Sequence, residues 1–289
     1  MNRGRNEHPT FDLQAHSTCS DGTLAPGAVV GRASAEGVEV MALTDHDTVD
    51  GVEEAAAAAR EHGLRFSRAA ELSAVHRPDA DVHILGYELR LDRGLLDALQ
   101  GFRADRARRI EAMAQRLREL GLELDDRELR ARREQGLPLG RPHLASAVLT
   151  VRNAGRLREL GVHDRDSLFA ALLVPGAPAY VPRTRPTTAD AIAAIHAAGG
   201  VAVWAHPYWD EDEPLPVLER FVAEGIDGVE CFYATHTQEQ TRTLHATCRK
   251  LGLLITGSAD FHGPENQRFD RFRAFSLYGL SPDLGPIAA

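Results

Sequence analysis

The sequence has few cysteines and no long apolar run. Its three cysteines, Cys19, Cys231 and Cys248, form no CxxC pair. An odd number of widely spaced cysteines argues against a disulfide framework and fits a reducing compartment. No stretch approaches the roughly 18 apolar residues that span a bilayer, and the opening "MNRGRNEHPT" has no apolar signal segment. We therefore expect a soluble, cytoplasmic protein with no membrane partner.

Positive charge is also in short supply. Lysine and arginine number 33 against 42 acidic residues, so the net charge is −9. Such a surface repels phosphate backbones and disfavours non-specific binding of duplex DNA. Residues 101–135 contain ten arginines but also eight acidic residues. Because a helix with both signs is usually a solvated face with ion pairs four residues apart, we expect small nucleotides or short RNA ends as partners, and no duplex DNA.

Short apolar runs alternate with helical patterns in two parts of the chain. In residues 10–91, strands are predicted over 38–44 and 81–89, with a helix over 50–63 between them. The same alternation returns from residue 180. Hydrophobic residues make up 43% of the chain, which is enough for a sizeable core. The alternation predicts an α/β protein with a parallel sheet or barrel.

The segment between these parts has a different texture. It is rich in Arg and Leu, and one face of its first helix gathers Phe102, Ile110, Met113, Leu117 and Leu120. We interpret it as a helical insertion. The sequence therefore divides into an α/β metal-binding domain over 10–91 and 180–265, a helical insertion or lid over 92–179, and a C-terminal tail over 266–289.

Histidines and carboxylates recur where the predicted strands end. They are His16, Asp45, His46, Asp47, Glu71, His206, Asp260 and His262, and His83 lies within a further predicted strand. A single histidine after a strand is usually a cap or a surface group. In a parallel α/β fold, however, the carboxyl ends of all strands open on one face, so these side chains would meet and need a shared partner. Imidazole and carboxylate suit Zn²⁺, Mn²⁺ or Fe²⁺, which predicts a site with more than one metal ion.

Six motifs, in order, carry a family resemblance. "QAHSTCSDG", "ALTDHDT", "AELS", "HILGY", "WAHP" and "GSADFHG" resemble those of the polymerase and histidinol phosphatase (PHP) superfamily of metal-dependent phosphoesterases. The insertion motif "GRPHLA" and the later "YVPR" are most similar to the branch of 3',5'-nucleoside bisphosphate phosphatases and 5'-to-3' exoribonucleases. The resemblance covers residues 10–265. It implies a distorted (β/α)7 barrel with a trinuclear metal site and a mainly helical insertion.

The resemblance also implies how nine residues divide among three metals. The first metal would be held by His16, Glu71 and Asp260, with Gln14 where the family usually has the first histidine of an HxH pair; the second by Glu71, His83 and His206; the third by Asp21, His46 and His262. We expect two or three divalent ions per chain, Mn²⁺ first, with Zn²⁺, Fe²⁺ or Mg²⁺ as alternatives.

Gln14 is the departure from the family pattern. Its neutral amide is a poor donor beside an imidazole, so the first metal should bind more weakly. The other eight positions match, which favours an active enzyme over a decayed one. Cys19 lies inside the same loop without a partner cysteine and is interpreted as a packing residue.

Two residues of "GRPH" are expected to act on substrate. By resemblance, Arg141 and His143 face the substrate phosphate, and Arg183 is a weaker candidate for the same role. Divalent ions at the site would activate water and neutralise phosphate oxygens. The proton donor for the leaving alcohol is left open among Asp45, Asp47 and His236.

Several functions remain open at this point. The leading hypothesis is a phosphatase acting on phosphate monoesters of small nucleotides, with 3',5'-nucleoside bisphosphates first. The alternatives are a phosphodiesterase or 5'-to-3' exoribonuclease acting on short RNA, and a catalytically impaired metal- or nucleotide-binding protein. A histidinol phosphatase is disfavoured because the "GRPH" insertion resembles the nucleotide branch.

Overall fold

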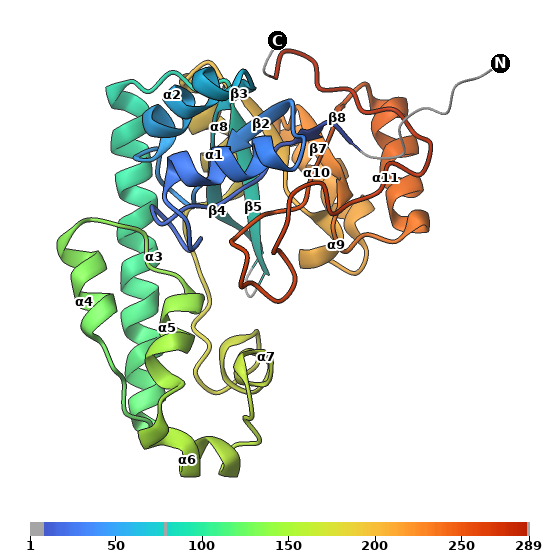
Figure 1. The fold of residues 1–289 in the computed structure, drawn as a ribbon. Helices are drawn as coiled ribbons and strands as arrows, with labels where there is room; N and C mark the ends of the chain where they lie inside the picture. The colour runs from blue at the N-terminus through green and yellow to red at the C-terminus, as the bar shows by residue number, and fades with distance from the viewer. Residues whose placement is uncertain (1–8, 78–79, 288–289) are drawn as a thin grey trace.

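The computed structural model describes residues 9–77 and 80–287, so the last two residues of the predicted tail lie outside it. The strands within these ranges form two sheets, one ordered β1-β2-β3 and the other β4-β5-β6-β7-β8 (Figure 1). Their bounds are β1 (Phe11–Asp12), β2 (Val40–Leu43), β3 (Arg65–Arg68), β4 (Ala70–Arg77), β5 (Ala80–Tyr87), β6 (Val201–Trp204), β7 (Gly228–Tyr233) and β8 (Leu254–Ser258).

Helices connect most of these strands and build the insertion. Their bounds are α1 (Pro26–Ala35), α2 (Val52–His62), α3 (Arg93–Glu119), α4 (Arg127–Glu134), α5 (Arg141–Val148), η1 (Val151–Asn153), α6 (Ala154–Glu159), α7 (Arg165–Leu168), η2 (Phe169–Leu173), α8 (Thr188–Ala197), α9 (Pro207–Asp210), α10 (Pro214–Glu224) and α11 (Gln238–Leu251). Thr187 and Thr237 begin α8 and α11 with capping boxes, and Gly63 ends α2 at φ 71°.

Strand direction follows the prediction only in part. β1, β2 and β3 are parallel, as are β6, β7 and β8. β5 runs antiparallel to both β4 and β6, so the predicted parallel pairing is wrong at this strand. The reason lies in the connection: only two residues separate Arg77 from Ala80, whereas a parallel pair needs a crossover of about a dozen residues or more.

The two sheets do not join into a closed barrel in the described part of the chain. Isolated parallel bridges link them: Ala15 after β1 with Phe261 after β8, and His46 after β2 with Glu71 of β4. One hydrophobic core nevertheless lies under both sheets, because it includes Leu13 after β1 as well as Trp204 of β6. The fold is therefore a mixed α/β architecture, and the (β/α)7 barrel is not confirmed.

The insertion has a hydrophobic core of its own. Helix α3 begins beside the sheets, and α4 to α7 gather around its far part, away from the strands (Figure 1). Phe102 belongs to the core under the sheets, whereas Ile110, Met113 and Leu117 belong to a second core made of residues 110–180. The predicted apolar face of α3 is thus confirmed, and it spans both cores.

The segment after β8 folds back over the first sheet. Phe272 stacks on Phe261 with ring centroids 4.4 Å apart, and the Arg273 amide donates to Asp12 Oδ2 at 2.7 Å. These contacts hold the chain that follows His262 against the end of β1. Separately, none of the helices in the described residues has the length and apolar character required to span a membrane.

Candidate metal centre

All nine residues predicted to hold metal gather at one end of the two sheets. They are Gln14, His16 and Asp21 after β1, His46 after β2, Glu71 in β4, His83 in β5, His206 after β6, and Asp260 and His262 after β8. The loops that follow the parallel strands lie at this edge because the carboxyl ends of parallel strands point the same way. Antiparallel β5 contributes His83 because its register places that residue opposite Ser73, two positions past Glu71.

Glu71 lies at the centre of the cluster and is 1% exposed. Its Oε2 is 3.0 Å from His16 Nε2 and 3.4 Å from His46 Nδ1. Its Oε1 is 3.0 Å from His83 Nδ1 and 3.4 Å from His206 Nε2. One carboxylate thus faces four imidazoles, two on each oxygen, which is the geometry that a bridging ligand requires.

Two aspartates flank the cluster. Asp21 Oδ1 is 3.5 Å from His16 Nδ1 and 3.6 Å from His262 Nε2, while its Oδ2 is 3.7 Å from His46 Nε2. Asp260 Oδ1 is 3.2 Å from His16 Nε2. His16 therefore lies between the central carboxylate and both flanking ones.

Three triples of donors in the described residues have ligand atoms within 4.8 Å of one another. They are Glu71 with His83 and His206, His16 with Asp21 and His262, and His16 with His46 and Glu71. The first has the same membership as the second metal site implied by the resemblance. The other two triples both contain His16. His46, which the resemblance assigns to the third metal, is grouped here with Glu71, although its Nε2 is also 3.7 Å from Asp21 Oδ2.

The donor atoms fit divalent ions because they lack other partners. His16 Nε2, His46 Nδ1, His83 Nδ1, Asp21 Oδ1 and Asp260 Oδ1 are buried and make no hydrogen bond within the described chain. Buried polar atoms without a partner are costly. A shared cation would satisfy nitrogen lone pairs and carboxylates together, so the donor set matches the predicted metal chemistry.

The neighbouring charges of the cluster shift the pKa values of its members. Burial opposes a charge on His16, but the carboxylates of Asp260 and Glu71 outweigh it and raise the pKa of the ring well above its ordinary value. Burial also opposes ionisation of Asp21, yet His46 and His262 hold its pKa well below the usual range. A proton and a metal ion would therefore compete for His16, while the lowered pKa of Asp21 favours its charged form.

Gln14 presents its nitrogen, not its oxygen, to the cluster. Its Nε2 donates to Glu71 Oε2 at 3.1 Å, and its Oε1 accepts from Ser258 Oγ at 3.4 Å. Ser258 Oγ also donates to Glu230 Oε1 at 2.6 Å. Burial raises the pKa of Glu230 to about 8, against the hydrogen bond that it accepts from Ser258. The contacts of Gln14 with Glu71 and Ser258 fix the direction of the amide.

Residues outside the predicted set orient its members. His206 has φ 32°, and its amide donates to Glu230 Oε2 at 2.9 Å. Its Nδ1 faces Asp210 Oδ2 at 3.3 Å, while Tyr233 donates to Asp260 Oδ2 at 2.9 Å. Sequence reasoning missed these supports. Two signals were present: a lone glutamate inside the apolar strand "GVECFY", and an aspartate four residues after His206.

The three residues left open as proton donors have different surroundings. Asp45 accepts from Ser17 N at 2.7 Å and Ser17 Oγ at 2.6 Å, which fixes the loop that carries His16. Asp47 pairs with Arg106 at 2.9 Å. His236 donates from Nδ1 to the Cys231 carbonyl, and burial lowers its pKa to about 4, so its ring is neutral at pH 7.

Four arginines gather between the insertion and the sheets; we call Arg106, Arg109, Arg141 and Arg183 the arginine cluster. Asp81 Oδ2 is 2.6 Å from Arg109 Nη1 and 3.8 Å from Arg141 Nη2, and its Oδ1 is 3.9 Å from Arg183 Nε. Arg109 Nη2 and Arg183 Nε make no hydrogen bond within the described chain. The cluster therefore keeps unused donors.

The arginine cluster adjoins the metal centre. Arg106 Nη1 contacts Asp47 Oδ2. Burial lowers the pKa of His46, and the positive charge of Arg106 lowers it further. Arg183 Nη1 donates to the Ser73 carbonyl at 3.0 Å, on the strand that carries Glu71. Sequence reasoning treated the arginines of α3 as solvated, but Arg106 is only 9% exposed. The missed signal is its position on the apolar stripe, four residues after Phe102.

His143 also faces this region. It is buried, and its Nδ1 accepts a hydrogen bond from the Gly140 amide at 3.1 Å. The negative charge of Asp21 acts to raise the pKa of the ring. Burial is the larger effect, and the pKa of the ring is lowered overall. Because Nδ1 is an acceptor, the proton of the neutral ring lies on Nε2, which leaves an N–H donor.

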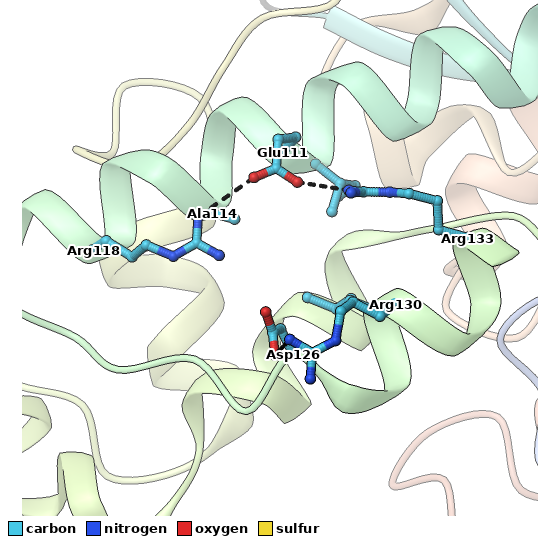
Figure 2. Close-up of a pocket in the computed structure, with 8 residues that line it drawn as sticks. Glu111, Ala114, Arg118, Asp126, Arg130 and Arg133 are labelled. Carbon is cyan, nitrogen blue, oxygen red and sulfur yellow. Dashed lines mark hydrogen bonds and ion pairs between the residues drawn. The ribbon is translucent and has the colours of Figure 1, made fainter.

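A small pocket between α3 and α4 lies apart from the centre (Figure 2). Figure 2 shows Glu111 between Arg118 and Arg133, to which it pairs at 3.4 and 2.6 Å. Asp126 pairs with Arg130 four residues on. None of the residues predicted to act on substrate or metal lines this pocket. This part of the Arg-rich segment is the mixed-charge solvated face that the sequence predicted.

Comparisons with known proteins agree with this arrangement. The chain matches the PHP domain family over residues 12–93. It is 33% identical to a 3',5'-nucleoside bisphosphate phosphatase of Chromobacterium violaceum, over 96% of this chain and 93% of that protein. It is 31% identical to a 5'-3' exoribonuclease of Haemophilus influenzae, over 88% of this chain and 90% of that protein.

A solved structure extends the likeness to three dimensions. A protein of Bifidobacterium adolescentis described as a metal-dependent phosphoesterase superposes with a TM-score of 0.76 at 29% identity, covering 96% of this chain and 94% of the other. The fold, its cluster of imidazoles and carboxylates and these likenesses together define a metal-dependent hydrolase acting on phosphate esters. The chain belongs to the PHP family, which confirms the resemblance of its motifs.

Proposed function

We propose that the protein hydrolyses phosphate monoesters of small nucleotides, with 3',5'-nucleoside bisphosphates as the first substrates to test. The observation that carries the proposal is the arginine cluster beside the metal centre, because an anion-binding patch next to a metal cluster suits a small substrate with more than one phosphate. The likeness to a 3',5'-nucleoside bisphosphate phosphatase supports it.

Metal ions are proposed to occupy the cluster around Glu71. His83, His206 and Glu71 would hold one ion, and His16 with Asp260, Asp21, His46 and His262 would hold the others, with Mn²⁺ expected first. Bound divalent ions would supply an activated water and neutralise phosphate oxygens. Gln14 would support Glu71 through its hydrogen bond, so that the ion beside His16 has one strong ligand fewer.

The chain's own cations are proposed to position the substrate phosphate. Arg141 is partly exposed, and its nearest carboxylate oxygen, on Asp81, is 3.8 Å away. Its guanidinium can therefore donate two parallel hydrogen bonds to the oxygens of a phosphate. Arg183 and Arg109 are buried behind it and add positive charge. His143 would donate from Nε2 to a phosphate oxygen or to the leaving oxygen.

The insertion, residues 92–179, is proposed to act as a lid over the centre formed by residues 10–91 and 180–265. Its separate hydrophobic core supports treating it as a unit. It contacts the metal loop directly, because Arg132 donates to the Ser20 carbonyl. Both Arg141 and His143 are on α5, so a movement of this unit would bring the phosphate-binding groups to the centre or remove them.

A metabolite screen tests the proposal. Phosphate release from a panel of phosphorylated metabolites should be measured with Mn²⁺-reconstituted protein, chelator-treated protein and Glu71→Gln. We expect release from nucleotides with the reconstituted protein only, and reduced metal content in Glu71→Gln. Release that survives both chelation and Glu71→Gln would overturn the proposal, as would a metal-loaded protein that releases no phosphate from any nucleotide.

A further inference from the structure

The loop after β8 and helix α9 form an exposed aromatic rim beside the metal centre. We define the rim as Trp209, Arg268 and Phe269. Trp209 is 46% exposed, more than any other Phe, Tyr or Trp side chain of the described residues. An exposed tryptophan covers little of a core and offers a ligand an apolar ring with a polar N–H.

Contacts connect the rim to the proposed metal ligands. Trp209 follows His206 by three residues, and its amide donates to the His206 carbonyl at 2.8 Å. Phe269 lies with its ring centroid 5.7 Å from that of Trp209 and 5.6 Å from that of His262. The His262 amide also donates to the Phe269 carbonyl at 2.9 Å. The rim is therefore fixed to two residues of the cluster.

The side chain of Arg268 contacts both the tryptophan ring and the insertion. Arg268 Cζ lies 5.6 Å from the centroid of Trp209, and Arg268 Nη2 is 3.4 Å from Asp166 Oδ2 on α7. The ring is thus held in place by the guanidinium and by Phe269, yet nearly half of the side chain stays exposed. It is a pre-positioned aromatic surface between the metal centre and the lid.

We infer that Trp209 is the stacking platform for the nucleobase of the substrate, which makes it a specificity-determining residue. The inference rests on the proposed function, since it requires a nucleotide whose phosphate lies at the metal centre. Every base has a π-face, so an aromatic ring selects nucleotides over base-free phosphates without selecting one base. The positive charge of Arg268 also suits an anionic substrate.

Tryptophan emission gives a test that does not depend on turnover. The chain has two tryptophans, and Trp204 is fully buried against Phe221. Titration of the metal-loaded protein with adenosine 5'-phosphate should quench the emission of Trp209, while ribose 5-phosphate, which has no base, should leave it unchanged. In Trp209→Phe the quenching should disappear. Equal responses to the two ligands, or quenching that persists in Trp209→Phe, would overturn the inference.

Kinetics separate stacking from a packing role. Trp209→Ala should raise KM for adenosine 3',5'-bisphosphate roughly ten- to a hundredfold, and Trp209→Phe should restore most of the loss. KM for ribose 5-phosphate should not change, and Leu251→Ala, which trims an exposed apolar residue of α11, should alter neither. If Trp209→Ala weakens both substrates equally, the ring only packs against the loop. If no phosphate ester is hydrolysed but base-dependent quenching is seen, the proposed function fails and the platform stands.

Discussion

The side-chain amide nitrogen of Gln14 donates a hydrogen bond to Glu71 Oε2 at 3.1 Å. An imidazole at this position could instead offer a nitrogen lone pair to a cation. The central carboxylate of this chain therefore has an amide donor where the family pattern has a metal ligand, and the ion beside His16 should be the one held least tightly.

Replacing Gln14 by histidine should restore that ligand. We expect Gln14→His to raise the metal content of the reconstituted protein and to raise kcat at subsaturating Mn²⁺, because the added imidazole strengthens the weakest ion. Elemental analysis and a titration of metal against activity measure the two effects. Gln115→His, on the exposed side of α3, is the matched control. Identical metal dependence in wild type and Gln14→His would mean that the glutamine is a tolerated substitution.

Removing Arg141 should weaken substrate and leave metal unaffected. Arg141→Ala should lower kcat/KM for a nucleotide substrate by roughly ten- to a hundredfold, equivalent to about 1.5–3 kcal/mol of lost charge-assisted hydrogen bonds. Metal content should stay constant. Arg152→Ala, which removes an exposed arginine of the same insertion, should have no effect. An unaltered kcat/KM in Arg141→Ala would remove that residue from the site.

Arg106 should matter for stability through its ion pair with Asp47. The pair is buried at 2.9 Å, and Arg106→Ala would leave Asp47 without its cation. We expect the free energy of unfolding in urea to fall by about 3–5 kcal/mol, because an uncompensated buried charge is costly. Arg127→Ala breaks only an exposed pair with Asp125 and should leave the urea midpoint unchanged. Equal midpoints for both variants would show that Asp47 is solvated.

His236 should make stability depend on pH in a defined window. Burial lowers its pKa to about 4, whereas an unfolded histidine titrates near 6.5. The unfolded chain therefore binds the extra proton between these values, so stability falls as pH drops from about 6.5 to about 4, by about 3 kcal/mol in all. His236→Asn keeps a donor for the Cys231 carbonyl and removes the titration.

The measurement is urea unfolding of wild type and His236→Asn across this range. The difference in unfolding free energy between the two proteins should change with pH inside the window and stay constant above it. A difference that does not vary with pH would place the His236 ring in water.

The gathering of the centre was predictable because it depends on chain order. Residues that follow successive strands of a βα pattern meet at one edge, and His16, His46 and His206 do so. The reversal of β5 was also readable in principle, since two residues cannot cross over between parallel strands. The direction of the Gln14 amide was not, because it is set by Ser258, 244 positions away, and by Glu71, 57 positions away.

The burial of the arginines could not be read from composition. Residues 101–135 look solvated when their charges are counted, and Glu111 with Arg118 and Arg133 confirms this for one face. Arg106 lies on the other face, where the insertion meets the sheets. Which arginines of α3 are buried and which are solvated depends on how the two hydrophobic cores pack against this helix.

Product analysis tests the central claim most directly. The Mn²⁺-reconstituted protein should be given adenosine 3',5'-bisphosphate and, separately, a 5'-phosphorylated oligoribonucleotide, and the products resolved by chromatography. We predict stoichiometric release of inorganic phosphate and adenosine monophosphate from the bisphosphate, and loss of this release on chelation. Release of mononucleotides from the oligoribonucleotide, with no phosphate from the bisphosphate, would contradict the account and assign the centre to phosphodiester cleavage.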